Sequence, residues 1–247
     1  MLDLIQLKNL KKGKEMHSKI LSIALLLMML LGVACSPQAA ATVAPITAAT
    51  ASPTEAPTAE PVTLTVMAAA SLTESFNEIA EAFQAQNPNV TVIFNFSGSQ
   101  TLAEQIGQGA EADVFASASK KYMTTVVDGG YVDAAASTVF VSNKLVVIYP
   151  KDNPAGITTL QDLAKDGIKL DLADESVPVG KYALEFLDKA AADAEFSADF
   201  KDKVLANVVS YEDNVKAVVT KVTMGEADAG IVYYTDITAD IASQVGT

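Results

Sequence analysis

This sequence of 247 residues has one histidine, one cysteine and no arginine. The histidine, His17, and the cysteine, Cys35, both fall within an N-terminal segment that has the pattern of an export signal. A mature chain that begins at a modified Cys35 would hold no histidine and no free thiol. Catalytic sites that depend on histidine or cysteine, disulfides, and zinc sites built on these residues are therefore excluded.

The absence of arginine also limits the ligands and partners. After Cys35 the chain has 12 lysines and 28 acidic residues, a formal net charge of −16. Such a surface repels nucleic acid and anionic lipid headgroups, so we expect no nucleic-acid partner. A bound anion could not be held by an arginine fork, and neutral dipoles would have to hold it instead.

The segment 1–35 is predicted to be a lipoprotein signal peptide. Lysines lead into an apolar run at 20–33, which is too short to span a bilayer comfortably. Residues 31–35 resemble a bacterial lipobox, with Gly32 where leucine is more usual, and Cys35 would be the lipidated first residue of the mature protein. The alternatives are an uncleaved anchor helix and a true start at Met16.

The segment 36–61 is predicted to be a disordered tether. It is rich in Pro, Thr and Ala, and it has no aromatic residue and no periodicity. Such a segment buries too little apolar surface to offset its ordering entropy. With a lipidated cysteine before it, the tether would hold a folded domain off the outer face of the cell membrane, in the periplasm or at the cell surface.

The remainder, 62–247, alternates strand and helix patterns and is therefore predicted to be an α/β fold. Short β-branched runs predict the strands, and apolar residues at helical spacing predict the helices. The predicted strands lie at 62–68, 90–96, 113–116, 144–149, 169–172 and 229–233, and the predicted helices lie from 71, at 101–108, 120–127, 160–164, 181–190 and 213–224.

Two strand-to-helix junctions have the small polar residues that an anion site needs. Ser71 with Glu74 is predicted to form a capping box, and Thr101 with Glu104 could form another. In open α/β sheets, ligands bind beyond the carboxyl ends of the strands, where helices begin. The simpler interpretation is that both residues only cap their helices, and the pattern alone does not choose between the two.

Several runs in order along the chain resemble the periplasmic molybdate-binding protein family. They include AAASLTESF, FNFSGSQTLAEQI, GAEADVFASAS, NKLVVIYP, DESVPVGKYALEFL and GEADAGIVYYTD, and together they extend over 62–236. The resemblance implies a two-lobed type II periplasmic binding protein fold with mixed, mostly parallel sheets, divided into lobe one at 62–140 and lobe two at 141–247. Family members continue beyond the AGIVY strand, so we expect the C-terminal part of lobe one and one hinge strand to be missing.

The resemblance also implies the ligand and the residues that bind it. Ser71 and Ser99 would donate from lobe one, the main-chain amides of Val179 and Val215 from lobe two, and Tyr233 through its phenol. The ligand would be molybdate or tungstate, delivered to an ABC permease by a monomeric binding protein that is not an enzyme. No cofactor is expected, and molybdenum would be present only within the oxyanion, without direct protein–metal bonds.

The chemistry of these groups agrees with such a ligand. Molybdate is a dianion without a proton near neutral pH, so its site needs donors only. Hydrogenphosphate would require an acceptor, whereas sulfate presents the same pattern as molybdate at smaller size. The four acidic residues that flank the expected site are interpreted as helix-terminal or surface carboxylates: Asp174, Glu175, Glu212 and Asp213.

Three other functions stay open at this point. A ferric-ion carrier is one, because Tyr233 and Tyr234 are consecutive, although successive strand residues point to opposite faces. A lipoprotein hydrolase would need a Ser-Lys or carboxylate arrangement, and no lysine is close in sequence to Ser71 or Ser99. A sensory lipoprotein that binds an oxyanion is not separable from a transport protein by sequence.

Overall fold

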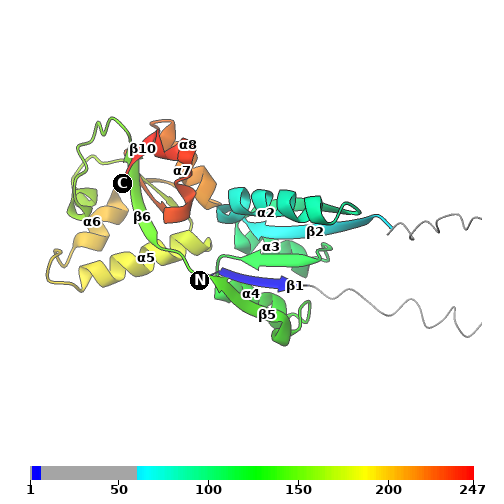
Figure 1. The fold of residues 1–247 in the computed structure, drawn as a ribbon. Helices are drawn as coiled ribbons and strands as arrows, with labels where there is room; N and C mark the ends of the chain where they lie inside the picture. The colour runs from blue at the N-terminus through cyan, green and yellow to red at the C-terminus, as the bar shows by residue number, and fades with distance from the viewer. Residues whose placement is uncertain (1, 7–59) are drawn as a thin grey trace, which may run out of the picture. The chain divides into compact units, whose positions relative to one another are not determined.

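The computed structural model describes residues 2–6 and 60–247. Most of the predicted signal segment, the tether up to residue 59, and Cys35 lie outside the described residues, so these assignments stay predictions. Within the described part, no helix combines the length and the apolar character needed to cross a bilayer. The structure holds two five-stranded sheets with helices against them (Figure 1).

The first sheet, which with its helices we call lobe one, has the strand order β3-β2-β4-β1-β5. The parallel strands β3, β2 and β4 form one side of this sheet, with β3 at its edge. These strands coincide closely with the β-branched runs of the sequence, except for β1 and β5, which sequence patterns did not indicate. The bounds are β1 (Leu2–Gln6), β2 (Val62–Ala69), β3 (Val90–Ser97), β4 (Val114–Ser117) and β5 (Ser137–Val141).

Strand β1 comes from the segment predicted to be a signal peptide. It lies between β4 and β5 and pairs antiparallel with both (Figure 1). Among the described strands β5 has no other partner, so β1 joins β5 to the rest of the sheet. Whether this segment is removed on export stays a prediction.

The helices of lobe one follow the ends of its strands. The helical spacing of apolar residues predicted α2 correctly, although Ile79 and Phe83 stay exposed on it while Ala80 is buried. A single 3-10 turn, η1, lies between β2 and α2. The α-helix therefore begins at Thr73, two residues after its predicted start at Ser71. The bounds are η1 (Ala70–Leu72), α2 (Thr73–Gln86), α3 (Ser99–Gly107), α4 (Lys120–Asp128) and η2 (Ala134–Ala136).

The second sheet belongs to lobe two and has the strand order β10-β6-β9-β7-β8. Its centre is formed by β9, which is parallel to β7 and antiparallel to β6, so both sheets are mixed. Every residue of β7 and of β9 is buried, as expected for strands that are covered on both faces. The bounds are β6 (Leu145–Pro150), β7 (Leu170–Ala173), β8 (Val208–Glu212), β9 (Ala229–Tyr233) and β10 (Val245–Gly246).

Two helices of lobe two begin at the edge of this sheet that faces lobe one. α5 begins at Pro178, three residues before its predicted start, because proline is well suited to the first turn of a helix. α7 begins at Val215 with Asn214 as its N-cap. The bounds are η3 (Leu160–Ala164), α5 (Pro178–Ala191), α6 (Phe200–Ala206), α7 (Val215–Thr223), η4 (Tyr234–Asp236) and α8 (Ala239–Ala242).

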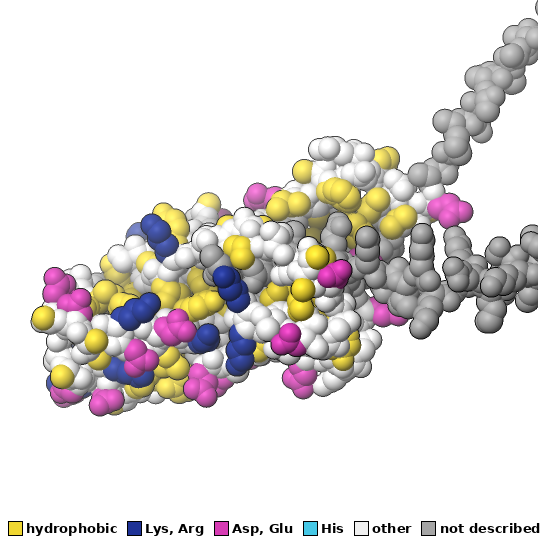
Figure 2. Space-filling view, turned by 90° about the horizontal axis from the view of Figure 1, so that it is seen from below, with side chains coloured by type: hydrophobic (Ala, Val, Ile, Leu, Met, Phe, Trp, Pro, Cys, Tyr) yellow, Lys and Arg dark blue, Asp and Glu magenta, His cyan; other side chains and the backbone are white. Residues whose placement is uncertain are grey.

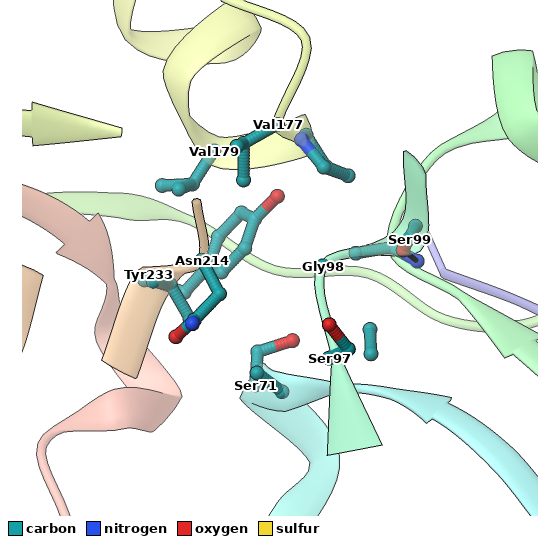
Figure 3. Close-up of a pocket in the computed structure, with 13 residues that line it drawn as sticks. Ser71, Ser97, Gly98, Ser99, Val177, Val179, Asn214 and Tyr233 are labelled. Carbon is teal, nitrogen blue, oxygen red and sulfur yellow. Dashed lines mark hydrogen bonds between the residues drawn. The ribbon is translucent and has the colours of Figure 1, made fainter. Parts of the chain in front are cut away.

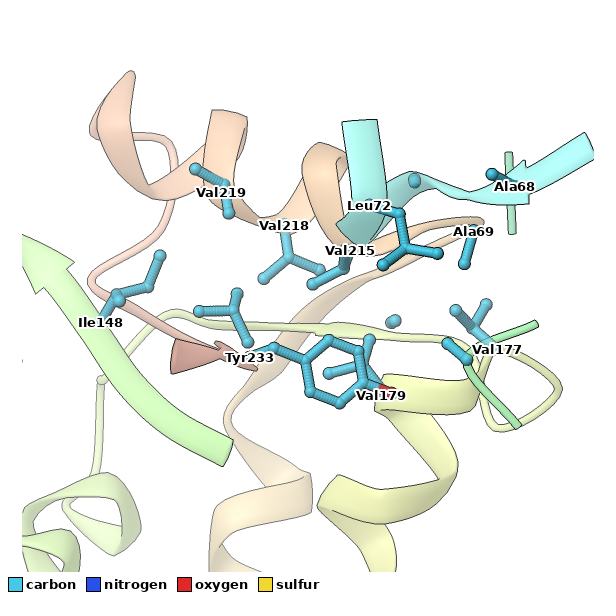
Figure 4. Packing of buried hydrophobic residues seen from close by; sticks show 14 of the residues in the cluster. Ala68, Ala69, Leu72, Ile148, Val177, Val179, Val215, Val218, Val219 and Tyr233 are labelled. Atoms are coloured by element: carbon cyan, nitrogen blue, oxygen red, sulfur yellow. The ribbon is translucent and has the colours of Figure 1, made fainter. Parts of the chain in front are cut away.

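The buried apolar residues form three clusters, one of which contains residues of both lobes. Lobe one has a cluster around Phe115, and lobe two has one around Phe200. The third brings Ala69 and Leu72 of lobe one together with Val215 of lobe two (Figure 4). The small side chains at the end of β2 allow this close approach, and the same residues surround the candidate site.

Candidate functional site

A small cavity lies where strand ends of lobe one meet helix starts of lobe two. All five residues predicted to bind the ligand line it, and their function as ligand-binding residues stays a prediction. Lobe one contributes the segments after β2, β3 and β4, whereas lobe two contributes the starts of α5 and α7 and the end of β9. The lining residues are Ala69, Ala70, Ser71, Ser97, Gly98, Ser99, Ala118, Val177, Pro178, Val179, Asn214, Val215 and Tyr233.

Two hydroxyl groups in this cavity are buried without a hydrogen-bond partner. Ser71 is 7% exposed and Tyr233 is 5% exposed, and neither Ser71 Oγ nor Tyr233 Oη bonds to another described group. Figure 3 shows both oxygens facing the space between the two lobes. A buried hydroxyl without a partner costs free energy, about 1–3 kcal/mol. The two orphaned hydroxyls therefore point to a polar ligand that bonds to both.

Tyr233 is suited to donate its proton in a hydrogen bond without losing it. Burial raises the pKa of the Tyr233 phenol far above its ordinary value, and the neighbouring Tyr182 and Asp236 raise it further. The phenol therefore stays protonated throughout the neutral range. Tyr234 is 67% exposed and does not line the cavity, so the expectation that only one of the consecutive tyrosines enters it is confirmed.

Ser99 lies in the cavity wall and already has one partner. It is fully buried at the start of α3, and its Oγ accepts a hydrogen bond from the Ala118 amide at 2.9 Å. Its hydroxyl proton is still available to a ligand. Ala118 follows β4, so this bond holds the ends of two strands of lobe one at the cavity.

Both predicted capping boxes are wrong. Ser71 makes no capping bond, because it lies inside the short turn η1, and Glu74 extends instead toward Lys216 of lobe two. Thr101 is the third residue of α3, which begins at Ser99 with Gly98 as N-cap. Capping would have provided a structural function for Ser71, and without it the hydroxyl is free for a ligand.

Lobe two presents helix N-termini to the cavity. Val179 is in the first turn of α5, and Val215 is the first residue of α7. First-turn amides have no partner within their helix, and the helix dipole favours an anion near them. Asn214 caps α7, because its Oδ1 accepts a hydrogen bond from the Ala217 amide at 3.1 Å. The start of α5 packs so closely that a Cβ at Gly180 would lie 2.2 Å from the carbonyl oxygen of Asp174.

No charged side chain lines this cavity. The flanking acid Asp174 is exposed and bonds to Ser176, whose hydroxyl and amide lower the pKa of that carboxyl. On the face drawn in Figure 2, lysines and acidic side chains are interspersed. Within the described ranges, no group of three or more His, Cys, Asp or Glu residues is placed to hold a metal ion. The cavity therefore offers neutral donors, which suit a fully deprotonated anion.

Sequence reasoning missed Gln100 and did not assign Asn214 a part in the site. Gln100 of α3 donates a hydrogen bond from Nε2 to the Asp213 carbonyl at 2.7 Å, which joins lobe one to lobe two beside the cavity. Tyr122 of α4 makes a second such bond to the Ser176 carbonyl. No local pattern indicates these bonds. Asn214, in contrast, has the familiar signature of an N-cap before an apolar helix.

Residues 64–246 match the family described as bacterial extracellular solute-binding protein. The chain is 38% identical over 174 residues to "Molybdate-binding protein ModA" of Mycobacterium tuberculosis H37Rv, with 70% of this chain and 62% of that relative covered. It is 36% identical over 176 residues to "Putative ABC transporter substrate-binding lipoprotein YvgL" of Bacillus subtilis 168, with 71% of this chain and 64% of that relative covered.

A solved structure agrees with these matches. It is the "substrate binding domain of putative molybdenum ABC transporter from Clostridium difficile", at 31% identity and a TM-score of 0.53, with 75% of this chain and 76% of that one covered. The chain spans less than two thirds of the two curated relatives named above.

Proposed function

The chain belongs to the bacterial extracellular solute-binding protein family, and we propose that it captures molybdate or tungstate in the cavity between its lobes. The observation that carries the proposal is the pair of buried hydroxyls, Ser71 Oγ and Tyr233 Oη, which face one cavity without partners. The amides at the starts of α5 and α7 face the same space from lobe two. The names of the similar proteins, two of which refer to molybdate or molybdenum, support this choice of ligand.

The cavity lining favours a dianion over a protonated anion. Hydrogenphosphate carries a proton and needs an acceptor, and no carboxylate lines the cavity to provide one. A ferric site needs several anionic ligands, whereas Tyr233 is the one tyrosine in the cavity lining and no carboxylate accompanies it. No lysine lines the cavity, so the cavity lining contains no Ser-Lys pair that could catalyse hydrolysis. We therefore propose a binding function without a catalytic step and without a cofactor.

The proposal includes delivery of the anion to an ABC permease by a monomeric, exported protein. The relative from Bacillus subtilis, named as a transporter lipoprotein, supports an anchor of this kind. Lipidation would occur at Cys35, the single cysteine of the sequence. Mass spectrometry of the membrane fraction should find an acylated Cys35 at the mature N-terminus. A Cys35→Ser variant that stays equally membrane-bound would exclude the anchor but not the binding function.

Titration calorimetry tests the ligand directly. Molybdate, tungstate, sulfate, phosphate and ferric iron are each added to the purified protein. We expect tight binding of molybdate and tungstate, with little change between about pH 6 and 8, because neither ligand nor donors titrate there. Tighter binding of sulfate would assign the cavity to the smaller dianion. Phosphate binding equal to that of molybdate would contradict the donor-only site.

A further inference from the structure

Lys216 joins the two lobes through an ion network outside the cavity. Its Nζ lies 2.9 Å from Oε1 and 2.8 Å from Oε2 of Glu74, which belongs to α2 of lobe one. The same Nζ lies 3.5 Å from Oδ1 of Asp236, which belongs to η4 of lobe two. Lys216 is itself in α7, so one ammonium group connects three elements.

Each member of this network is close to a residue that lines the cavity. Lys216 directly follows Val215, and Glu74 lies in the first turn of α2, just beyond Ser71. Asp236 accepts a hydrogen bond from the Tyr233 amide at 3.0 Å through its Oδ2. The network therefore lies next to three of the groups that are proposed to contact the anion, one from lobe one and two from lobe two.

The burial of Asp236 makes the positive charge of Lys216 difficult to replace in this network. Asp236 is fully buried, and its Oδ1 accepts no hydrogen bond from a described group. Burial raises the pKa of Asp236 to about 6, and the positive charge of Lys216 opposes that rise. A buried carboxylate is costly unless an opposite charge accompanies it. Asp236 thus fixes the ammonium group of Lys216 in the position from which it reaches Glu74.

We propose that Lys216 is a positioning residue of the anion site, which latches lobe two to lobe one through Glu74 and so retains the bound anion. The ligand part of this inference rests on the proposed function, whereas the latch itself does not. Lobe closure traps a ligand that has already entered. Loss of the latch should therefore raise the dissociation rate and leave the association rate unchanged.

The first measurement needs no ligand. Spin labels are placed at the exposed positions Glu81 of α2 and Lys189 of α5, as cysteines in the full chain with Cys35→Ser. Distances between the labels are measured by electron–electron double resonance. Glu74→Gln should broaden the distribution toward longer distances, because it removes only the partner in lobe one. Lys216→Met should do the same, and Lys216→Arg should restore the distribution found with lysine.

The second measurement uses molybdate in stopped-flow or filter-binding kinetics. Glu74→Gln should raise the dissociation rate about three- to tenfold, as for an ion pair that is partly exposed. The double variant Glu74→Gln/Lys216→Met should release molybdate no faster than the single variant Lys216→Met, because both substitutions remove the same ion pair. Lys203→Met is the matched control, since Lys203 pairs with Asp199 at 2.9 Å within lobe two, and it should change neither measurement.

The two proposals fail in different ways. A wild-type protein that binds no molybdate would contradict the proposed function. The distances between the spin labels would still test the latch. Unchanged distances in both Glu74→Gln and Lys216→Met would overturn the latch even if molybdate binds tightly. An equal effect of Lys203→Met would also overturn it, because the change would then be a general response to lost charge.

Discussion

Gln100 and Asp213 are joined across the cavity edge by a hydrogen bond of 2.7 Å, although 113 residues separate them in sequence. The bond connects the first turn of α3 in lobe one to the loop before α7 in lobe two. Gly98 leaves the space for it, since a Cβ there would lie 2.4 Å from Gln100 Nε2 and 2.6 Å from the Asp213 oxygen. The closeness of the lobes therefore depends on a residue without a side chain.

Replacing Gly98 with alanine should weaken oxyanion binding by about tenfold or more, which corresponds to about 1.4 kcal/mol or more. The added methyl group displaces Gln100 and prevents lobe two from approaching. The backbone at Gly98, with φ −61° and ψ 140°, accepts alanine, so the melting temperature without ligand should change little. Gly107→Ala on the same helix is the control, because a Cβ there meets nothing within 4 Å. Equal affinities in both variants would contradict the expected closure.

Ser71→Ala and Ser99→Ala should differ in their effects on stability. Under the proposed function, each variant loses a hydrogen bond to a charged ligand, worth about 1.5–3 kcal/mol, so each should lower affinity about ten- to hundredfold. Ser71 Oγ has no partner, so its loss should leave the free energy of unfolding of the ligand-free protein unchanged or higher. Ser99→Ala also leaves the Ala118 amide unpaired, which should cost about 1–3 kcal/mol.

Calorimetric affinities and thermal unfolding without ligand separate these effects. If Ser71→Ala left oxyanion affinity intact, Ser71 would not be a ligand-binding residue.

Tyr233→Phe should lower oxyanion affinity by about tenfold or more, and it should do so equally from pH 6 to pH 9. The raised pKa of Tyr233 keeps the wild-type phenol protonated over this range, so its donor function does not titrate. Removing a buried hydroxyl that lacks a partner should not reduce stability in the absence of ligand. Tyr234→Phe is the control, because that ring is exposed. A wild-type affinity that declines toward pH 9 would contradict this account of Tyr233.

Asp171→Asn should stabilise the protein at pH 8 and have little effect below about pH 4. Asp171 is fully buried, and its burial, followed by the negative charge of Glu212, raises its pKa to about 7. The folded state therefore retains a proton that the unfolded state has lost, and the free energy of unfolding falls as pH rises from about 4 to 7, by up to about 1.4 kcal/mol per pH unit. The variant, which cannot ionise, should lack this decline.

Asp162→Asn should have the opposite effect and lower the stability of the protein at neutral pH. The pKa of Asp162 is lowered, first by Lys165 and then by the amides of Thr158 and Thr159. Its contribution to stability is therefore present at neutral pH and is lost only in strong acid. Thermal unfolding from pH 3 to 8 checks both variants. Parallel profiles for wild-type protein and Asp171→Asn would show that Asp171 does not titrate as expected.

A chain that begins at Ser36 should have a less stable lobe one, because it lacks β1. Within the described residues, β5 pairs with β1 alone, so the amides of β5 should lose protection from hydrogen exchange. The amides of β7 and β9 in lobe two should keep their protection and serve as the internal control. If β5 exchanges equally slowly in both chains, β1 does not hold it in solution.

Local patterns in the sequence were sufficient to predict the positions of most strands and helices. Periodicity indicates which side of a segment is buried, and it does so even when the element that packs against that side is unknown. It located β2, β3 and β9 to within about a residue. It did not indicate β8, whose residues alternate between half-buried and exposed, nor β1, whose partners are far along the chain. The family resemblance, rather than periodicity, selected the five residues that meet at one cavity.

The sequence by itself determined that this is an α/β chain, that an anion would have to be held without arginine or histidine, and which serines lie at strand ends. Only the tertiary structure decided what those groups contact. Glu74 extends to Lys216, 142 residues away, instead of capping its own helix, and Ser71, which lies inside η1, keeps its hydroxyl without a partner in the cavity. The physical reason is that a capping box is a local bond that competes with every other partner the fold brings near, and a charged lysine from the other lobe is the stronger partner.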